Sequence, residues 1–138
     1  MGTRGARRLS PPTPALRAKY HTIVTDVGQM ASEFADAGIF VFFGPDAPEE
    51  LHEFAILTEA SKLFANVEVG DIVVIDDAPY PTLCVGPIAN QNLANLGHLV
   101  VKFNGLSVPE LPGDISLPAV PAPAVKPGTV IEIRGGGD

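Results

Sequence analysis

Short apolar runs, separated by glycine, proline and polar turns, cover most of the chain after residue 19. Residues 20–25 are rich in β-branched and aromatic side chains, and residues 39–43 form an unbroken apolar run between two glycines. Runs this short, bounded by turn residues, are typical of β-strands. Further strands are predicted at 67–75, where two stretches join through a Gly-Asp turn, and at 80–85, 98–103, 115–117 and 130–133.

Helical patterns are few and short. Asn90 is placed to cap the start of a helix, and Gly97 is placed to end it in the left-handed conformation. Residues 48–54 begin with a proline and acids, which suit the first turn of a helix, and residues 31–37 fit either a helical turn or a loop. No internal repeat is visible. The pattern predicts a mainly β fold, a small antiparallel β-barrel or sandwich with one or two short helices.

Composition supports one small domain. The chain has 138 residues and a mass of 14.4 kDa, with 46% hydrophobic residues and a mean hydropathy of +0.23. It is too apolar to be a disordered chain. Its 14 prolines and 14 glycines exclude long helices and coiled coils. The proline-rich stretch 118–127 predicts an extended arm that either crosses the surface or reaches a neighbouring subunit.

The charges are unevenly distributed along the chain. Residues 1–19 hold five of the 9 basic residues and no acid, whereas the rest of the chain holds four basic and 16 acidic residues. We therefore expect a disordered basic extension over 1–19, a β-domain over 20–134 and a flexible glycine-rich end over 135–138. A body this acidic repels a phosphate backbone, so nucleic acid is not expected as a partner.

Motifs for membranes, metals and cofactors are missing from the sequence. No apolar run is long enough for a transmembrane segment and no secretory signal precedes the first strand, so the sequence predicts a cytoplasmic protein. Cys84 is the single cysteine and predicts a buried thiol rather than a disulfide or a nucleophile. The three histidines, His21, His52 and His98, fit no metal-binding spacing. We expect neither a metal nor a cofactor.

Several short motifs follow one another along the chain. They are Glu53-Phe54, Asn92-Leu93-Ala94-Asn95-Leu96-Gly97-His98, Phe103-Asn104-Gly105-Leu106, Pro112-Gly113 and Pro127-Gly128. On these motifs, the chain from Tyr20 to about Arg134 resembles the enzyme IIA component of the glucitol/sorbitol-specific phosphotransferase system. The resemblance leaves out residues 1–19. It implies a cytoplasmic phosphocarrier of mostly β structure.

The resemblance also implies where the chemistry lies. In that family a histidine accepts a phosphoryl group from the small histidine-containing carrier protein and passes it to the IIB component of a sugar transporter. The histidine belongs to a His-x-His motif after Glu-Phe, and in this chain Thr58, Glu59 and Ala60 hold the positions of that motif. Because threonine cannot form the labile phosphoramidate, the resemblance predicts that phosphocarrier activity is lost. His98, in the Leu-Gly-His motif, either replaces the missing histidine or is bonded to nearby backbone.

Two functions therefore stay open. The first is a phosphocarrier of sugar uptake that works through His98, together with the carrier protein and the IIB and IIC components. The second, which we favour, is a pseudoenzyme that has kept the fold for binding, scaffolding or self-assembly as a homo-oligomer. Apolar patches are what subunit contacts cover. For the second function, the predicted contact is the apolar run Ile39, Phe40, Val41, Phe42 and Phe43.

Overall fold

The computed structural model describes residues 18–136, and the remaining parts of the two predicted terminal segments lie outside the described residues. The strands are β2 (Ala18–Val27), β3 (Ile39–Phe43), β4 (Ile56–Thr58), β5 (Ile72–Ile75), β6 (Ala78–Pro81), β7 (Cys84–Val85), β8 (Leu99–Lys102), β9 (Asp114–Ser116) and β10 (Val130–Arg134). The helices are α2 (Ala31–Asp36), the 3-10 helix η2 (Glu49–Phe54) and α3 (Ala89–Leu96). Lys19, predicted to lie in the basic extension, already belongs to β2.

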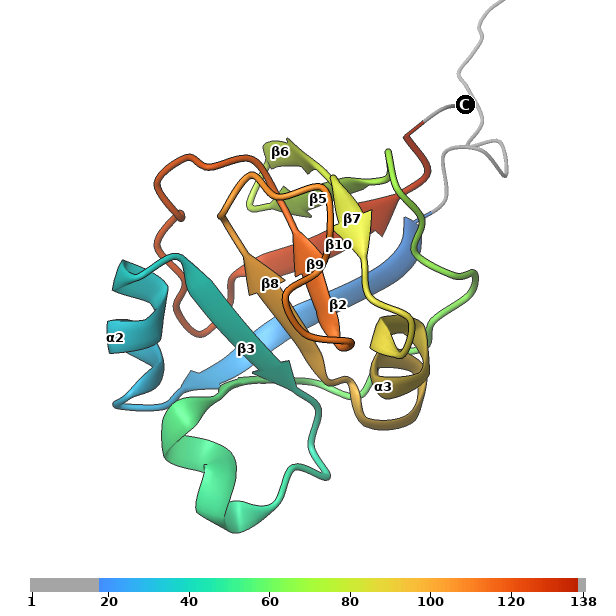
Figure 1. Ribbon diagram of the computed structural model, residues 1–138. Helices are drawn as coiled ribbons and strands as arrows, with labels where there is room; N and C mark the ends of the chain where they lie inside the picture. Colours follow the sequence, from blue (N-terminus) through green and yellow to red (C-terminus); the bar gives the residue numbers. More distant parts are fainter. Residues whose placement is uncertain (1–17, 137–138) are drawn as a thin grey trace, which may run out of the picture.

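These strands form one curved sheet in the order β6-β5-β10-β2-β4-β3-β8-β9-β7. The sheet wraps around the core as a half-barrel, with the short helices at its rim (Figure 1). Neighbouring strands are antiparallel except in the pairs β3–β4 and β8–β9. The sequence-based expectation of a mainly β, barrel-type fold with few helices is confirmed.

Six consecutive strands of the sheet, from β2 to the edge strand β7, form two similar halves. In the first half, β4 pairs antiparallel with β2 and parallel with β3, and α2 connects β2 to β3. In the second half, β9 pairs antiparallel with β7 and parallel with β8, and α3 connects β7 to β8. The halves meet where β3 pairs antiparallel with β8. The fold therefore has an internal pseudo-two-fold symmetry that no sequence repeat reveals.

A glycine ends the first strand of each half at the same place. The N–H of Gly28 donates to the carbonyl of Ala55 at 2.9 Å, and the N–H of Gly86 donates to the carbonyl of Asp114 at 2.7 Å. At both glycines a Cβ would overlap a backbone carbonyl of the segment that leads into β4 or β9. Only glycine allows this close approach. The correspondence makes α2 and α3 equivalent elements of the two halves.

The apolar run over β3 lies mostly inside the core of its own chain. Phe40, Phe42 and Phe43 are 0%, 5% and 8% exposed, and the rings of Phe40 and Phe42 meet edge to face with their centroids 5.8 Å apart. Ile39 and Val41 alternate with Phe40 and Phe42 and are half-buried on the opposite face of the strand, where Phe43 is buried against the ring of His98. A folded monomer therefore already uses the three phenylalanines, and only the two aliphatic residues face outward.

The helices differ from the sequence-based prediction at one cap. α3 begins at Ala89 with Ile88 at the N-cap, and Asn90 does not cap it. The Asn90 side chain instead accepts a hydrogen bond from the Val67 N–H at 2.6 Å and donates one to the Val67 carbonyl at 3.0 Å. Gly97 ends the helix with a φ of +62°, as predicted.

Two predicted strands are shorter than their apolar patterns. The pattern over 67–75 contributes only β5, because Asp71 closes a turn in which its N–H donates to the Glu68 carbonyl. The pattern over 80–85 is divided into β6 and β7 at Thr82, whose N–H donates to the Asp71 carbonyl at 2.8 Å. Hydrogen bonding to a distant loop, which apolar patterning does not report, decides where these strands begin and end.

Candidate functional site

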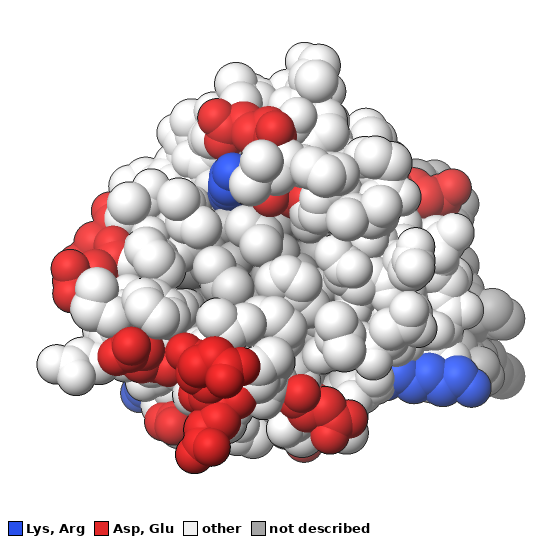
Figure 2. Space-filling view, turned by 60° about the horizontal axis from the view of Figure 1, so that its bottom comes forward, with Lys and Arg blue, Asp and Glu red and all other residues white. Residues whose placement is uncertain are grey.

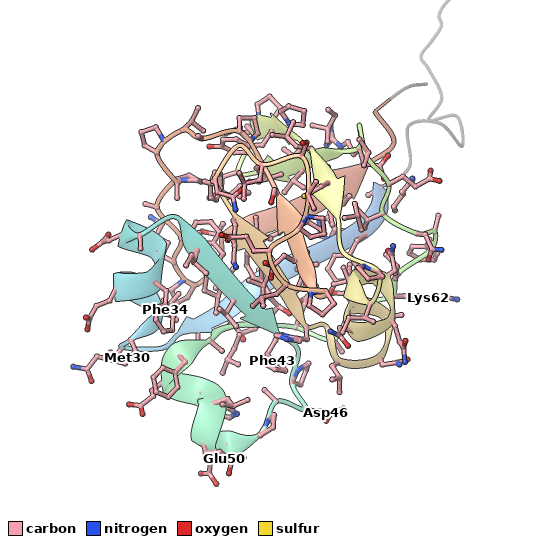
Figure 3. The ribbon with its side chains drawn as sticks, viewed as in Figure 1. Met30, Phe34, Phe43, Asp46, Glu50 and Lys62 are labelled. Carbon is pink, nitrogen blue, oxygen red and sulfur yellow. The ribbon has the colours of Figure 1, made fainter. Side chains whose placement is uncertain are left out.

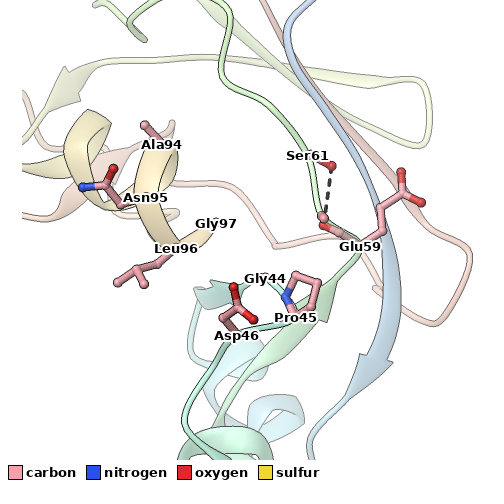
Figure 4. Close-up of a pocket in the computed structure, with 10 residues that line it drawn as sticks. Gly44, Pro45, Asp46, Glu59, Ser61, Ala94, Asn95, Leu96 and Gly97 are labelled. Carbon is pink, nitrogen blue, oxygen red and sulfur yellow. Dashed lines mark hydrogen bonds between the residues drawn. The ribbon is translucent and has the colours of Figure 1, made fainter.

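A cleft of about 100 Å³ lies where the chain leaves β3, where it leaves β4, and where α3 ends. Figure 4 shows these three segments around the opening. The lining residues are Gly44, Pro45, Asp46, Glu59, Ala60, Ser61, Ala94, Asn95, Leu96 and Gly97. Glu59 and Ala60, two of the three residues that the resemblance predicts at the positions of the His-x-His motif, line this cleft.

Two glycines allow the walls of the cleft to approach. The N–H of Gly44 donates to the carbonyl of Leu96 at 3.0 Å, which fastens the end of β3 to the end of α3. A Cβ on Gly97 would lie 2.9 Å from the Gly44 nitrogen. Gly97 also has a positive φ, which disfavours other residues. The backbone at this crossing fixes the shape of the cleft.

Thr58 lies beneath the cleft rather than in it. Its side chain is 2% exposed, and Oγ1 is 3.4 Å from the carbonyl oxygen of Phe43 and 3.2 Å from that of Glu59. Glu59 and Ala60 are exposed. Thr58 is thus a buried hydroxyl bonded to backbone, and Ala60 is an exposed methyl group.

The hydroxyl groups of Tyr20, Thr22, Thr58 and Ser61 gather in and beneath the cleft, and of these four residues sequence reasoning found only Thr58. Ser61 Oγ donates to Thr22 Oγ1 at 2.8 Å, and Thr22 Oγ1 donates to the Glu59 carbonyl at 3.2 Å. Burial raises the pKa of the Tyr20 phenol; hydrogen bonding to the hydroxyls of Thr22, Ser61 and Thr58 opposes the rise, and the Glu59 charge adds to it. Tyr20 is therefore a neutral phenol in the core.

His98 lies beside the same end of β3. Its ring stacks on Phe43, with the centroids 4.0 Å apart and the planes 14° apart, and Nδ1 is 3.0 Å from the carbonyl oxygen of Phe42. Because a carbonyl only accepts, Nδ1 carries the hydrogen, and in the neutral ring Nε2 keeps its lone pair. His98 is half-buried and follows the cleft residue Gly97. His98 is therefore bonded to nearby backbone through Nδ1, as one of its two predicted interpretations has it.

The charged residues that line the cleft are both acidic. The Asp46 carboxylate lies between the strand end and α3, whereas the side chain of Glu59 extends outward beside Ser61 (Figure 4). Lys62 points away from the molecule on the α3 side, and its Nζ lies 5.4 Å from the centroid of the Phe64 ring (Figure 3). The lining contains no lysine or arginine to neutralise a phosphoryl group.

The other chemistry-bearing residues lie outside this cleft. The His52 ring in η2 hydrogen-bonds to the Ala47 carbonyl at 3.1 Å through Nε2. Cys84 is buried, as predicted. Within residues 18–136, His, Cys, Asp and Glu side chains form no group of three that could hold a metal ion. No helix in that range is long and apolar enough to cross a membrane.

The comparisons with known proteins agree with the fold and with the sequence motifs. The family described as the PTS system glucitol/sorbitol-specific IIA component matches residues 19–132. The glucitol/sorbitol-specific EIIA components of Shigella flexneri and Escherichia coli K12 are each 27% identical over 115 residues, which cover 83% of this chain and 94% of the relative. A crystal structure of a PTS system IIA component from Enterococcus faecalis V583 superposes with a TM-score of 0.73 at 25% identity, covering 83% of this chain and 98% of that chain. The resemblance on the motifs from Glu53 onward is confirmed, and the chain belongs to the family of glucitol/sorbitol-specific IIA components of the phosphotransferase system.

Proposed function

We propose that this IIA-family protein has lost phosphocarrier activity and serves as a homo-oligomeric binding or assembly protein. One observation carries the proposal: the cleft region holds a buried threonine hydroxyl at Thr58 and a methyl group at Ala60 where the family resemblance places histidines. Phosphocarriers need an accessible imidazole because the phosphoramidate is labile enough to be handed on. A phosphothreonine is too stable to serve in the same way.

The charge of the cleft supports the same conclusion. Phosphoryl transfer depends on cations and hydrogen-bond donors that neutralise the transferred group. Asp46 faces the space where such a group would lie, and repulsion between unit charges at about 4 Å is about 1 kcal/mol even in water. A cleft of this charge favours a cationic or neutral group over a phosphoryl group.

His98 supports a second candidate function. Its Nδ1 hydrogen bond to the Phe42 carbonyl leaves Nε2 free to attack phosphorus, and its ring is held in place by Phe43. In this alternative, His98 would accept a phosphoryl group from the carrier protein and pass it to a IIB component. The alternative keeps the family's activity while moving its phosphorylated residue.

Phosphotransfer measured on the purified chain tests these two functions. The chain is incubated with phosphoenolpyruvate, enzyme I and the carrier protein, and acid-labile phosphate is measured. We expect none on this chain, because Thr58 and Ala60 cannot form a phosphoramidate. A His-x-His family member in a parallel reaction shows that the assay is active. Acid-labile phosphate that appears on the chain and disappears in His98→Ala would establish the alternative instead.

Self-assembly is expected to depend on the outward face of β3. Ile39 and Val41 are half-buried there, and Val100 lies opposite Val41 on the adjacent strand β8. We expect Val41→Asp to reduce the native mass measured by light scattering to that of a monomer, since a carboxylate opposes burial in an apolar contact. The β-rich circular dichroism should be retained.

A second aspartate variant controls for the added charge. Val108 is 70% exposed and lies in the loop between β8 and β9, away from the pairing of β3 with β8. Val108→Asp should keep the mass of the parent chain. A monomeric parent chain, or an oligomer that Val41→Asp leaves intact, would exclude this face as the contact.

A further inference from the structure

A groove of about 310 Å³ lies between α2 and the proline-rich arm. Val27 and Ile56 form its base, and α2 contributes two small side chains together with Ser32 and Asp36. Both of these polar residues are exposed and lie one helical turn apart. The opposite wall is residues 122–125 of the arm, where Ala122 and Val125 pack against the core of their own chain.

The equivalent place in the other half of the fold is filled by an extended segment. There Leu63 packs against the core and Val67 is 3% exposed. Asn90 on α3 holds the backbone of Val67 through two hydrogen bonds. Asn90 corresponds to Ser32 on α2, because each is the fourth residue after the first glycine of its half. By the same symmetry the arm, which follows β9 as this segment follows β4, is the counterpart of the segment, and the groove lies between the arm and α2.

We propose that residues 4–9 of the same chain bind in this groove. β2 begins at Ala18, at the far end of the sheet from α2, and ends at Val27 beside the groove (Figure 1). Nine extended residues cover this span of about 30 Å. A chain returning from Ala18 over the same distance needs about nine residues, which places Leu9 and the residues before it at the groove.

Charge complementarity favours this segment as the occupant. Residues 4–9 include Arg4, Arg7 and Arg8 together with Leu9. Asp36 lines the groove, and the adjacent helices add four more carboxylates that form no ion pair within the described residues, at Glu33, Glu49, Glu50 and Glu53. Lys126, at the end of the arm, is the cation nearest to this lining in sequence. On the face of the molecule that Figure 2 brings forward, acidic side chains gather and basic ones are few.

The segment carries arginines and a leucine, and the groove offers a carboxylate at Asp36 and small apolar side chains on α2. An arginine that pairs with Asp36 stays at the rim, where water and salt still reach it, so the pairing is expected to weaken as salt is added. Leu9 can cover the small apolar residues of α2 below the rim. The basic extension would then bind its own domain and shield part of its acidic surface.

Amide spectra of the isotope-labelled full chain test the proposal. Arg4→Ser/Arg7→Ser/Arg8→Ser should shift the backbone amides of α2 and of 122–125, and leave those of β5 and β6 in place. Asp36→Asn should give shifts at the same positions in the arm. Glu33→Gln, which removes a carboxylate of the same helix outside the groove lining, is the matched control and should shift the amides of the arm less than Asp36→Asn does.

Dilution separates binding within one chain from binding between chains. Binding by the chain's own segment predicts shifts that do not change with protein concentration. Shifts that vanish on dilution would assign the occupant to another copy, and unchanged amides in the triple variant would exclude the segment as an occupant. Either result would overturn the proposal.

Discussion

Lys102→Met is expected to lower the free energy of unfolding by about 3 to 5 kcal/mol, measured by urea denaturation. Lys102 Nζ lies 2.8 Å from Oδ2 of Asp114 and 3.2 Å from Oε1 of Glu110. Burial disfavours the charged ammonium, but the hydrogen bonds to these two carboxylates raise the pKa of Lys102 above its usual value. The Asp114 side chain is 1% exposed, so the variant would leave a buried carboxylate without its cation.

An exposed ion pair provides the matched control. Arg134 and Glu132 pair on β10 with 51% and 22% of their side chains exposed. Arg134→Met should cost less than about 1 kcal/mol, because exposed pairs contribute little. Adding Asp114→Asn to Lys102→Met should restore part of the lost stability. Equal small losses in both lysine and arginine variants would contradict the expected role of the buried pair.

A second lysine, Lys19, pairs with a buried aspartate in the same way. The pattern of apolar residues along the chain does not predict either ion pair. Lys19 Nζ lies 2.7 Å from Oδ2 of Asp71, and that carboxylate also accepts the N–H of Glu68 at 2.8 Å. Asp114 Oδ2 accepts the N–H of Leu111 at 3.0 Å in the same way. Strand positions could be predicted from alternation and turn residues. The turn at Asp71 could also be predicted from its Gly-Asp sequence, but its ion pair with Lys19 could not, because the two residues are 52 positions apart.

The order and direction of the strands in the sheet could not be predicted from local sequence patterns either. Apolar runs located β3 and β8, but the parallel pairing of each with a later strand depends on crossings fixed by Gly28 and Gly86. Neither glycine has a distinctive sequence context, since the overlap that forbids a side chain involves carbonyls on another segment. The pseudo-two-fold symmetry is visible only when those contacts are compared.

The candidate site was predictable in part. Family motifs located Thr58, Ala60 and His98, and the structure places all three around the end of β3. The motif directed attention to residues 58–60, whereas the carboxylate that faces α3 belongs to Asp46, which comes from the other side of the cleft. A residue contributed by a different loop has no signal in the motif itself.

If phosphocarrier activity is lost as proposed, Thr58→His/Ala60→His is expected to give a chain that takes up acid-labile phosphate from the carrier protein. The fold matches that of a solved PTS system IIA component, Ala60 lines the cleft, and the substitutions supply the imidazoles that a phosphoramidate requires. Thr58 lies beneath the cleft, so a ring at this position has to extend toward the opening beside Gly97. Phosphate that is lost in acid and kept in base identifies the product as phosphohistidine rather than phosphothreonine.

Asp46 should limit the rate of that restored transfer. Its carboxylate faces the space that the phosphoryl group enters, and relief of about 1 kcal/mol of repulsion corresponds to about a fivefold increase in rate. Asp46→Asn in the double-histidine background should therefore accelerate labelling, whereas Glu59→Gln, whose parent side chain extends outward, should have a smaller effect. Thr58→Asn/Ala60→Asn controls for added bulk without an imidazole. A folded double-histidine variant that stays unlabelled would show that the surface recognised by the carrier protein has changed as well, so that loss of phosphotransfer extends beyond the two substituted positions.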